Sequence, residues 1–425
     1  MDNRWRMDQL LKKNSISLTL LQLGQYFVPL IIFPYLARIL GVEGFGKLGF
    51  ATALTMFLVL IVDWGFNLSS TRNIAINRDD RYTCSNVFWN TFLARVIVTT
   101  AIIVILVILI NIVPKVSDLG SLIWLGVMQV LATTISTTFY YQGIEKMSAM
   151  ALINLGIRIL SIPLIILYVR ESDDVELAFA IQTGCFLLAS LVNLVLLLRS
   201  GQLIWIRPKF NAALRSLLAA STLFLSYAGT SLYTSSNAII LGLVSSEAAV
   251  GYFVAGFTLV KAVVGLSGPF AQAIFPRASL LFSQRPEESM AFSRKMFWLQ
   301  GMLGLLLSAG LLLFMPWGVT WFYGDAFEEA INVVAWLSAL PLVVCLASSL
   351  GMQTLVPLGK SKWFSTVLII CGLMNCFLLF FLGSVWGAVG AAFAVLLTEV
   401  AILIGMALGV KKFAPHLWHE LFRFA

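Results

Sequence analysis

The sequence predicts an all-α integral membrane protein, and three observations carry that prediction. Hydrophobic residues make up 60% of its 425 residues, only 11% are charged, and the mean hydropathy is +0.93. The charged share is less than half of that in soluble proteins, and so much apolar side chain exceeds what water-facing domains bury. The apolar runs are long and continuous, whereas the strands of a transmembrane barrel alternate over about ten residues.

Charged residues and turn residues divide the chain into about twelve apolar segments. A membrane helix needs about 20 apolar residues, and each segment should be helical because backbone amides in lipid require internal partners. The predicted spans are residues 16–40, 48–68, 87–113, 119–141, 149–169, 177–198, 220–244, 248–275, 295–316, 330–356, 364–383 and 386–410.

The basic residues alternate strongly between successive loops. The N-terminus, the even-numbered loops and the C-terminus hold 21 of the 28 Lys and Arg residues, and four lie inside spans. The odd-numbered loops hold only three, Lys47, Lys115 and Arg170. Because basic loops stay on the cytoplasmic side, both termini are predicted to be cytoplasmic. The net charge of +8 therefore reflects topology, and no nucleic-acid partner is predicted.

Twelve spans divide into six and six, and short motifs recur between the halves. The tripeptide Ile-Leu-Gly at 39–41 returns at 240–242, and Gly-x-x-Lys at 143–146 returns at 359–362. We interpret these as a duplicated six-helix unit, an arrangement common in secondary transporters. The predicted domains are an N-terminal lobe at 1–198, a cytoplasmic linker with an amphipathic segment at 199–219, and a C-terminal lobe at 220–425.

Catalytic, cofactor and metal motifs are not found in the sequence. The connections are too short for a soluble catalytic domain, so an enzyme is not predicted. Gly359-Lys360-Ser361 resembles the end of a phosphate-binding loop, but Thr354 stands where that loop needs glycine. His416 and His419 lack a third ligand nearby in the sequence.

Ionisable residues inside spans are candidate functional residues, because each costs several kcal/mol unless it is paired or hydrated. One interpretation is structural pairing, of Asp63 with Arg95 and of Lys261 with Glu399. The other is a water-filled central cavity with cationic walls, which suits an anionic substrate. Asp63 and Glu399 are then candidates for ion coupling, since a buried carboxylate can exchange protons. The six residues are Arg38, Asp63, Arg95, Arg158, Lys261 and Glu399.

Uncharged polar residues in the spans supply hydrogen-bonding groups suited to sugar hydroxyls. Hydrogen bonding between helices is an equally good explanation for each. They are Gln22, Gln25, Tyr26, Asn90, Asn154, Tyr227, Tyr233, Asn237 and Gln272.

Several motifs resemble those of a known family. Residues 33–41 (FPYLARILG), followed by 44–46 (GFG), resemble the first-span signature of Wzx-type polysaccharide flippases. The segments at 65–75, 141–147 and 272–277 resemble further segments of that family, in the same order along the chain. The likeness is stronger in the first half.

The resemblance implies membership of the multidrug/oligosaccharidyl-lipid/polysaccharide exporter superfamily, with two six-helix lobes around a central cavity. It implies a flippase that moves undecaprenyl-diphosphate-linked O-antigen or capsule repeat units across the bacterial inner membrane, from the cytoplasmic to the periplasmic leaflet. A cationic lumen is expected, and Arg95, Arg158 and Lys261 are the candidates by depth and charge. The candidate partners are the lipid-linked oligosaccharide, membrane lipids, and the polymerase and chain-length proteins of the same pathway.

Two rival functions remain open at this level. A multidrug exporter of the same architecture would favour an acidic, aromatic cavity, whereas the basic residues outnumber the acidic ones in these spans. A membrane polymerase or ligase would need a substantial outer loop with acid–base residues, and the outer loops are short. The sequence specifies neither the glycan, nor the coupling ion, nor the oligomeric state.

Overall fold

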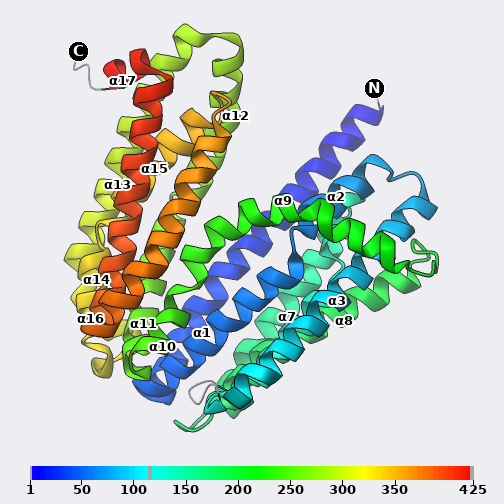
Figure 1. The fold of residues 1–425 in the computed structure, drawn as a ribbon, viewed down its shortest axis with the longest axis horizontal. Coiled ribbons are helices and arrows are strands. Elements are labelled where there is room, and N and C mark those ends of the chain that lie inside the picture. The colour runs from blue at the N-terminus through cyan, green and yellow to red at the C-terminus, as the bar shows by residue number, and fades with distance from the viewer. Residues whose placement is uncertain (1, 113–116, 422–425) are drawn as a thin grey trace. The chain divides into compact units, whose positions relative to one another are not determined.

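The computed structural model describes residues 2–112 and 117–421, and the regular structure in these ranges is entirely helical (Figure 1). The predicted all-α fold is therefore confirmed. Lys115, which was predicted in an outer loop, lies outside the described residues.

Nine helical stretches in the described ranges are long and apolar enough to cross a membrane. Two of them each cover parts of two predicted spans. In these two stretches, helical structure continues on both sides of a glycine at which the backbone turns. Gly41 (φ 68°, ψ −177°) lies in the stretch Ile31–Ile76, and Gly387 (φ 55°, ψ −129°) lies in Ser361–Phe413. Glycine adopts positive φ readily, so the chain can turn there without a loop. Helices thus cover every predicted span where the chain is described.

The chain divides into two compact units, Met1–Ala228 and Gly229–Ala425. The predicted boundaries at 198/199 and 219/220 stay a prediction. In the first unit α1 and α8 both pack against α5 and α7, and the short α2 packs against α6. Its helices are α1 (Asp2–Asp63), α2 (Phe66–Ile76), α3 (Arg81–Ile112), α5 (Gly120–Thr134), α6 (Thr138–Gly143), α7 (Met147–Tyr168), α8 (Val175–Arg199) and most of α9 (Phe210–Ser235).

The second unit is built around the long α16, which packs against α10, α11, α14 and α15. Helix α13 packs against α15 and carries the short C-terminal α17. The helices are α10 (Asn237–Val244), α11 (Glu247–Gly265), α12 (Gly268–Gln284), α13 (Pro286–Tyr323), α14 (Ala330–Leu337), α15 (Leu340–Leu350), α16 (Ser361–Phe413) and α17 (Pro415–Leu421), with a 3-10 turn at Asp325–Phe327 and a π-helical turn at Gly351–Leu355.

The same two spans, the second and the fourth, are broken in each unit, and the seventh span is also interrupted, at Ser236 between α9 and α10. The second span breaks between α1 and α2 at Trp64 (φ 45°) and Gly65 (φ 75°), and the fourth breaks between α5 and α6 at 135–137. The eighth breaks between α11 and α12 at 266–267, and the tenth between α14 and α15 at 338–339. Each break exposes backbone groups that must find partners away from water.

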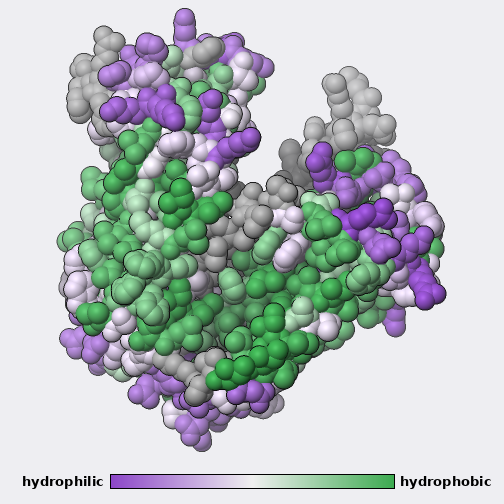
Figure 2. Space-filling view, viewed as in Figure 1, coloured by the Kyte–Doolittle hydropathy of each residue, from purple (hydrophilic) through white to green (hydrophobic). Residues whose placement is uncertain are grey.

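The surface of each unit matches a lipid environment. On the face shown in Figure 2, hydrophobic residues gather over the middle of each unit, and hydrophilic residues gather toward its ends. Large apolar side chains on α13 are exposed, among them Leu306 (68%), Leu313 (70%) and Trp321 (72%). Exposed apolar area of this extent would be unfavourable in water, which supports a membrane location.

The segment before α9 is fastened along α3. Residues 202–209 have no helical structure, yet their backbone groups bond to side chains that recur about every four residues of α3. The bonds are Arg81 Nε to Gln202 O (3.2 Å), Ile204 N to Ser85 Oγ (2.9 Å), Trp89 Nε1 to Ile204 O (3.0 Å) and Lys209 N to Asn90 Oδ1 (3.1 Å).

Candidate functional site in the membrane-spanning helices

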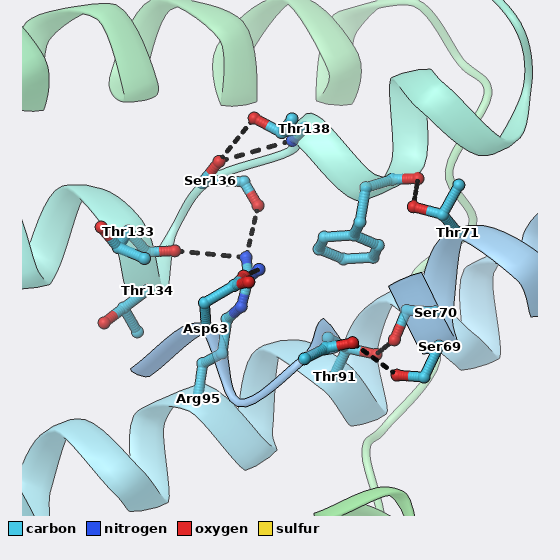
Figure 3. A network of polar contacts seen from close by, with 12 residues as sticks. Asp63, Ser69, Ser70, Thr71, Thr91, Arg95, Thr133, Thr134, Ser136 and Thr138 are labelled. Carbon is cyan, nitrogen blue, oxygen red and sulfur yellow. Dashed lines mark hydrogen bonds and ion pairs between the residues drawn. The ribbon is translucent and has the colours of Figure 1, made fainter. Parts of the chain in front are cut away.

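Asp63 and Arg95 form an ion pair inside the first unit (Figure 3). Asp63 is the last residue of α1, and Arg95 lies in the middle of α3. The Arg95 Nη2 donates to Asp63 Oδ1 at 2.8 Å, and the two side chains are 1% and 17% exposed. The pairing that equal depth suggested is therefore present.

Arg95 also donates hydrogen bonds to carbonyl groups at the break in the fourth span. Its Nη1 donates to the carbonyl oxygens of Thr133 (3.2 Å) and Ser136 (3.0 Å), which point toward it in Figure 3. Both carbonyls lie where α5 ends, at Thr134, and the Thr133 oxygen also accepts from the Ser136 amide at 3.1 Å. The negative end of the α5 dipole also favours a cation there. The Phe139 ring lies 4.9 Å from the guanidinium carbon, close enough for a cation–π contact.

Hydroxyl groups join the helices around this ion pair. Thr99 and Thr134 are hydrogen-bonded at 2.6 Å between α3 and α5, and Ser70 and Thr91 at 2.9 Å between α2 and α3. Thr71 on α2 donates to the Phe139 carbonyl on α6 at 3.1 Å. Polar groups near the breaks in the second and fourth spans therefore connect these two spans to the third.

Trp64, at the break in the second span, contacts the linker helix. Its Nε1 donates to the Leu217 carbonyl at 3.0 Å, and its ring stacks on Phe224 with centroids 4.4 Å apart. Both partners lie on α9. The bend that follows Asp63 is thus fixed to α9, the helix that leads into the second unit.

Arg158 differs from Arg95 in its surroundings. It is half-buried in α7, and its guanidinium lies 5.7 Å from the Phe186 ring of α8. Among the side chains that the structure describes, no carboxylate forms an ion pair with it. Arg158 therefore stays a candidate binding residue for an anionic ligand.

Lys261 and Glu399 do not form the second predicted pair. Both side chains are described, and no ion pair joins them in the described part of the chain. Lys261 is exposed on α11, with its ammonium 4.6 Å from the Phe257 ring. Glu399 is half-buried on α16. Arg38 is exposed near the end of the first span.

A buried amide cluster lies beside Glu399 in the chain. Asn375 donates to Asn237 at 2.7 Å, and Thr398 donates to Asn375 at 3.0 Å, which joins α10 to both halves of α16. A second buried amide pair joins Gln300 on α13 to Gln353 in the π-helical turn. Sequence reasoning singled out Asn237 but missed the other four residues, because uncharged polar residues in spans carry no distinctive pattern.

The described polar candidates serve structural hydrogen bonds. Asn90 receives the bond from the linker backbone, Asn154 accepts from Asn193 at 2.8 Å, and Asn237 belongs to the amide cluster. The remaining side chains lie outside the described ones. They are Gln22, Gln25, Tyr26, Tyr227, Tyr233 and Gln272.

Metal-ligating residues do not cluster in the part of the chain that the structure describes. No group of three or more His, Cys, Asp or Glu side chains lies close enough to hold a metal ion there.

Known proteins similar to this chain are transporters. A protein of Escherichia coli (strain K12) named "Putative O-antigen transporter" is 30% identical over 402 residues, which cover 95% of this chain and 97% of that protein. A protein of the same name from Shigella dysenteriae is 28% identical and covers 94% and 100%.

Solved structures share the fold at low identity. A multidrug resistance MATE family transporter of the MOP superfamily, in its inward-facing conformation, has a TM-score of 0.64 at 15% identity and covers 91% of this chain and 95% of that one. The lipid II flippase MurJ, in an inward closed conformation, has a TM-score of 0.63 at 15% identity and covers 96% and 89%. These matches establish the fold of a membrane transporter.

One family matches most of the chain. It is described as "Polysaccharide biosynthesis protein" and matches residues 11–282. The match spans the motifs that resemble Wzx-type flippases, and the resemblance is confirmed at the level of the family. The chain belongs to the polysaccharide biosynthesis protein family.

Proposed function

We propose that this protein is a flippase for undecaprenyl-diphosphate-linked oligosaccharide repeat units, of O-antigen or capsule. It would move them from the cytoplasmic to the periplasmic leaflet by alternating access. The observation that carries the proposal is Arg158, a half-buried guanidinium within a membrane helix with no carboxylate partner among the described side chains. The relatives named as O-antigen transporters and the fold shared with the MurJ flippase support it.

The chemistry of the substrate explains the need for a cation. A diphosphate carries at least two negative charges, and a membrane interior without counter-charge excludes it by many kcal/mol. A guanidinium binds phosphate oxygens in a bidentate manner. Lys261 is the second candidate, because it is exposed on its helix and has no ion-pair partner among the described residues.

Arg95 takes a different role in this proposal. One carboxylate and two carbonyl oxygens accept hydrogen bonds from its guanidinium. We therefore assign Arg95 and Asp63 to holding the broken helices. Glu399, which has no cation partner among the described side chains, becomes the leading candidate for ion coupling.

The rival proposal is a multidrug exporter, since MATE transporters share the fold. A site for cationic drugs needs acidic groups, and Glu399 would then be the binding residue. Arg158 and Lys261, which have no ion-pair partner among the described side chains, disfavour that function because they repel a cationic substrate.

We place the protein among transporters rather than enzymes. The polymerase and chain-length proteins of the same pathway are its proposed partners.

The function can be tested in proteoliposomes that contain a diphosphate-linked oligosaccharide. An impermeant glycosidase should digest about half of the glycan without the protein, because only the outer leaflet is accessible. Digestion should approach completion with the wild type and fall back with Arg158→Glu at equal protein content. Digestion equal to that of empty vesicles, together with transport of a lipophilic fluorescent cation, would favour the multidrug exporter.

We also propose that both termini are cytoplasmic in the inner membrane. Single cysteines in a Cys-less variant should react with an impermeant reagent from outside intact spheroplasts at 172–175 and 324–326. Cysteines at 78–81 and 285–288 should react only after permeabilisation. The reverse pattern would overturn the orientation.

A further inference from the structure

The start of α9 and the segment before it present exposed apolar side chains outside the candidate site. Trp205 is 70% exposed, Phe210 61%, Leu214 44% and Leu218 66%. The last three recur every four residues and form one stripe along the helix. An exposed apolar stripe of this kind is unfavourable in water.

The neighbouring side of the same helix is fixed to the first unit. Ala213, Leu217 and Ala220 are buried and pack with Phe66 and Ala94. The exposed stripe is therefore not the core-facing side of α9. Because the Trp64 bond to Leu217 and the bonds to α3 hold this segment in place, the stripe is displayed on a fixed surface.

Basic residues flank the exposed stripe. Arg207, Lys209 and Arg215 are all exposed, and Arg215 follows Leu214 directly on the helix. We name the four apolar residues and these three basic residues the linker face. A helix with an apolar stripe beside basic residues lies in the membrane interface, with the stripe toward the acyl chains and the cations at anionic headgroups.

We propose that the linker face binds anionic phospholipid headgroups in the leaflet on its own side of the membrane. Charge complementarity commits the surface to an anionic lipid rather than to a zwitterionic one. Each basic residue close to an anionic surface contributes about a fivefold preference. The exposed Trp205 fits the interface as well, since tryptophan is enriched at headgroup depth. This inference does not depend on the transported substrate.

The test uses the full-length protein in vesicles of phosphatidylglycerol and phosphatidylcholine. A nitrobenzoxadiazole fluorophore is attached to Leu214→Cys in a Cys-less variant, and doxyl-labelled forms of each lipid are added at equal mole fraction. Doxyl-phosphatidylglycerol should quench the fluorophore several-fold more strongly than doxyl-phosphatidylcholine. Aqueous iodide should quench it weakly, compared with the same fluorophore at the exposed His416→Cys.

A matched pair of triple variants separates local binding from net charge. Arg207→Gln/Lys209→Gln/Arg215→Gln should bring the quenching ratio of the two lipids close to one. The control Lys295→Gln/Lys362→Gln/Lys411→Gln removes three exposed charges from the second unit and should leave the ratio unchanged. Equal quenching by both lipids in the parent protein would overturn the proposal, and so would full quenching by iodide, which would mean that the face is in water.

A second measurement avoids the cysteine-free background. Native mass spectrometry of the otherwise unmodified protein should show fewer retained phosphatidylglycerol molecules in the Arg207/Lys209/Arg215 variant than in the wild type and the control variant. Equal retention in all three would contradict the proposal. Neither measurement involves transport, so failure here and failure of the flippase proposal are distinguishable.

Discussion

The two units use different side chains to hydrogen-bond the carbonyl groups at their broken spans. In the first unit the break in the fourth span is completed by Arg95, paired with Asp63. In the second unit, serines supply hydroxyl donors at the breaks, from Ser267 to the Val264 carbonyl and from Ser338 to the Ala335 carbonyl, both at 2.7 Å.

This difference distinguishes charges that hold the fold from charges that stay candidates for ligand binding or ion coupling. Among the described residues, no hydrogen bond joins Lys261 or Glu399 to a helix break in the second unit, and no ion pair joins the two side chains. A charge in a span is therefore not sufficient evidence of function. Its partners decide whether it holds the fold or can serve a ligand.

The largest effect is expected from Arg95→Ala. It removes the ion-pair partner of Asp63 and the hydrogen bonds from the guanidinium to the Thr133 and Ser136 carbonyls. Breaking a buried pair on one side costs about 3–5 kcal/mol, so the variant should lose most of its folded population. The melting temperature in detergent measures this. Asp63→Asn/Arg95→Gln should recover part of the loss, and wild-type stability of Arg95→Ala would contradict the structural role.

The next effect should appear in transport rather than in folding. Arg158→Glu and Lys261→Glu should each abolish surface polymer in a flippase-deleted strain, at protein levels near those of the wild type. Arg158→Lys keeps the charge but loses the bidentate geometry, so it should retain part of the activity. Wild-type polymer from both charge-reversed variants would remove the cationic binding mechanism.

Glu399→Gln should have a smaller and more selective effect. The substitution preserves shape, and no cation among the described side chains loses its ion-pair partner, so the melting temperature should change little. Gradient-driven transport in proteoliposomes should nevertheless fall, while exchange without a gradient should persist. Asp63→Asn should show the opposite pattern, with lower stability. A coupled rate equal to wild type in Glu399→Gln would exclude the coupling role.

The smallest effect concerns helix caps, which also differ between the units. Asp80 caps α3, and its carboxylate accepts from the hydroxyl and the amide of Thr83, which lowers the pKa of Asp80 from its usual 3.8. Ser246 caps α11 by accepting from the Ala249 amide at 3.2 Å. A lowered pKa stabilises the folded state above 3.8, and this contribution disappears as the pH falls through the folded value.

Hydrogen exchange of the capped amides should therefore respond differently to pH. Asp80→Ala should speed exchange at Thr83 near neutral pH, and the difference from the wild type should disappear as the pH falls through the lowered pKa of Asp80, below 3.8. Ser246→Ala should speed exchange at Ala249 at every pH, because a hydroxyl does not titrate in this range. Identical pH profiles for the two variants would show that ionisation of Asp80 does not contribute to its cap.

Hydrophobicity and charge predicted the helical spans well, since these depend on composition over long windows. The breaks at Trp64 and at 135–137 were not predicted, because neither contains the proline that usually marks one. The similar depth of the two charges in the membrane predicted the Asp63–Arg95 pair. The same reasoning also suggested a pair of Lys261 with Glu399. Depth along a helix does not define the direction in which a side chain points, and that direction depends on tertiary packing.

The fastening of residues 202–209 along α3 has a consequence for biosynthesis. These residues follow the last span of the first unit, yet Ile204 and Lys209 bond to side chains of α3, and Trp64 bonds to Leu217 on α9. The first unit therefore completes its contacts only after the chain has been synthesised beyond its sixth span. Because α9 then runs unbroken across the boundary at 228/229, insertion of the seventh span begins from a helix already held by the first unit.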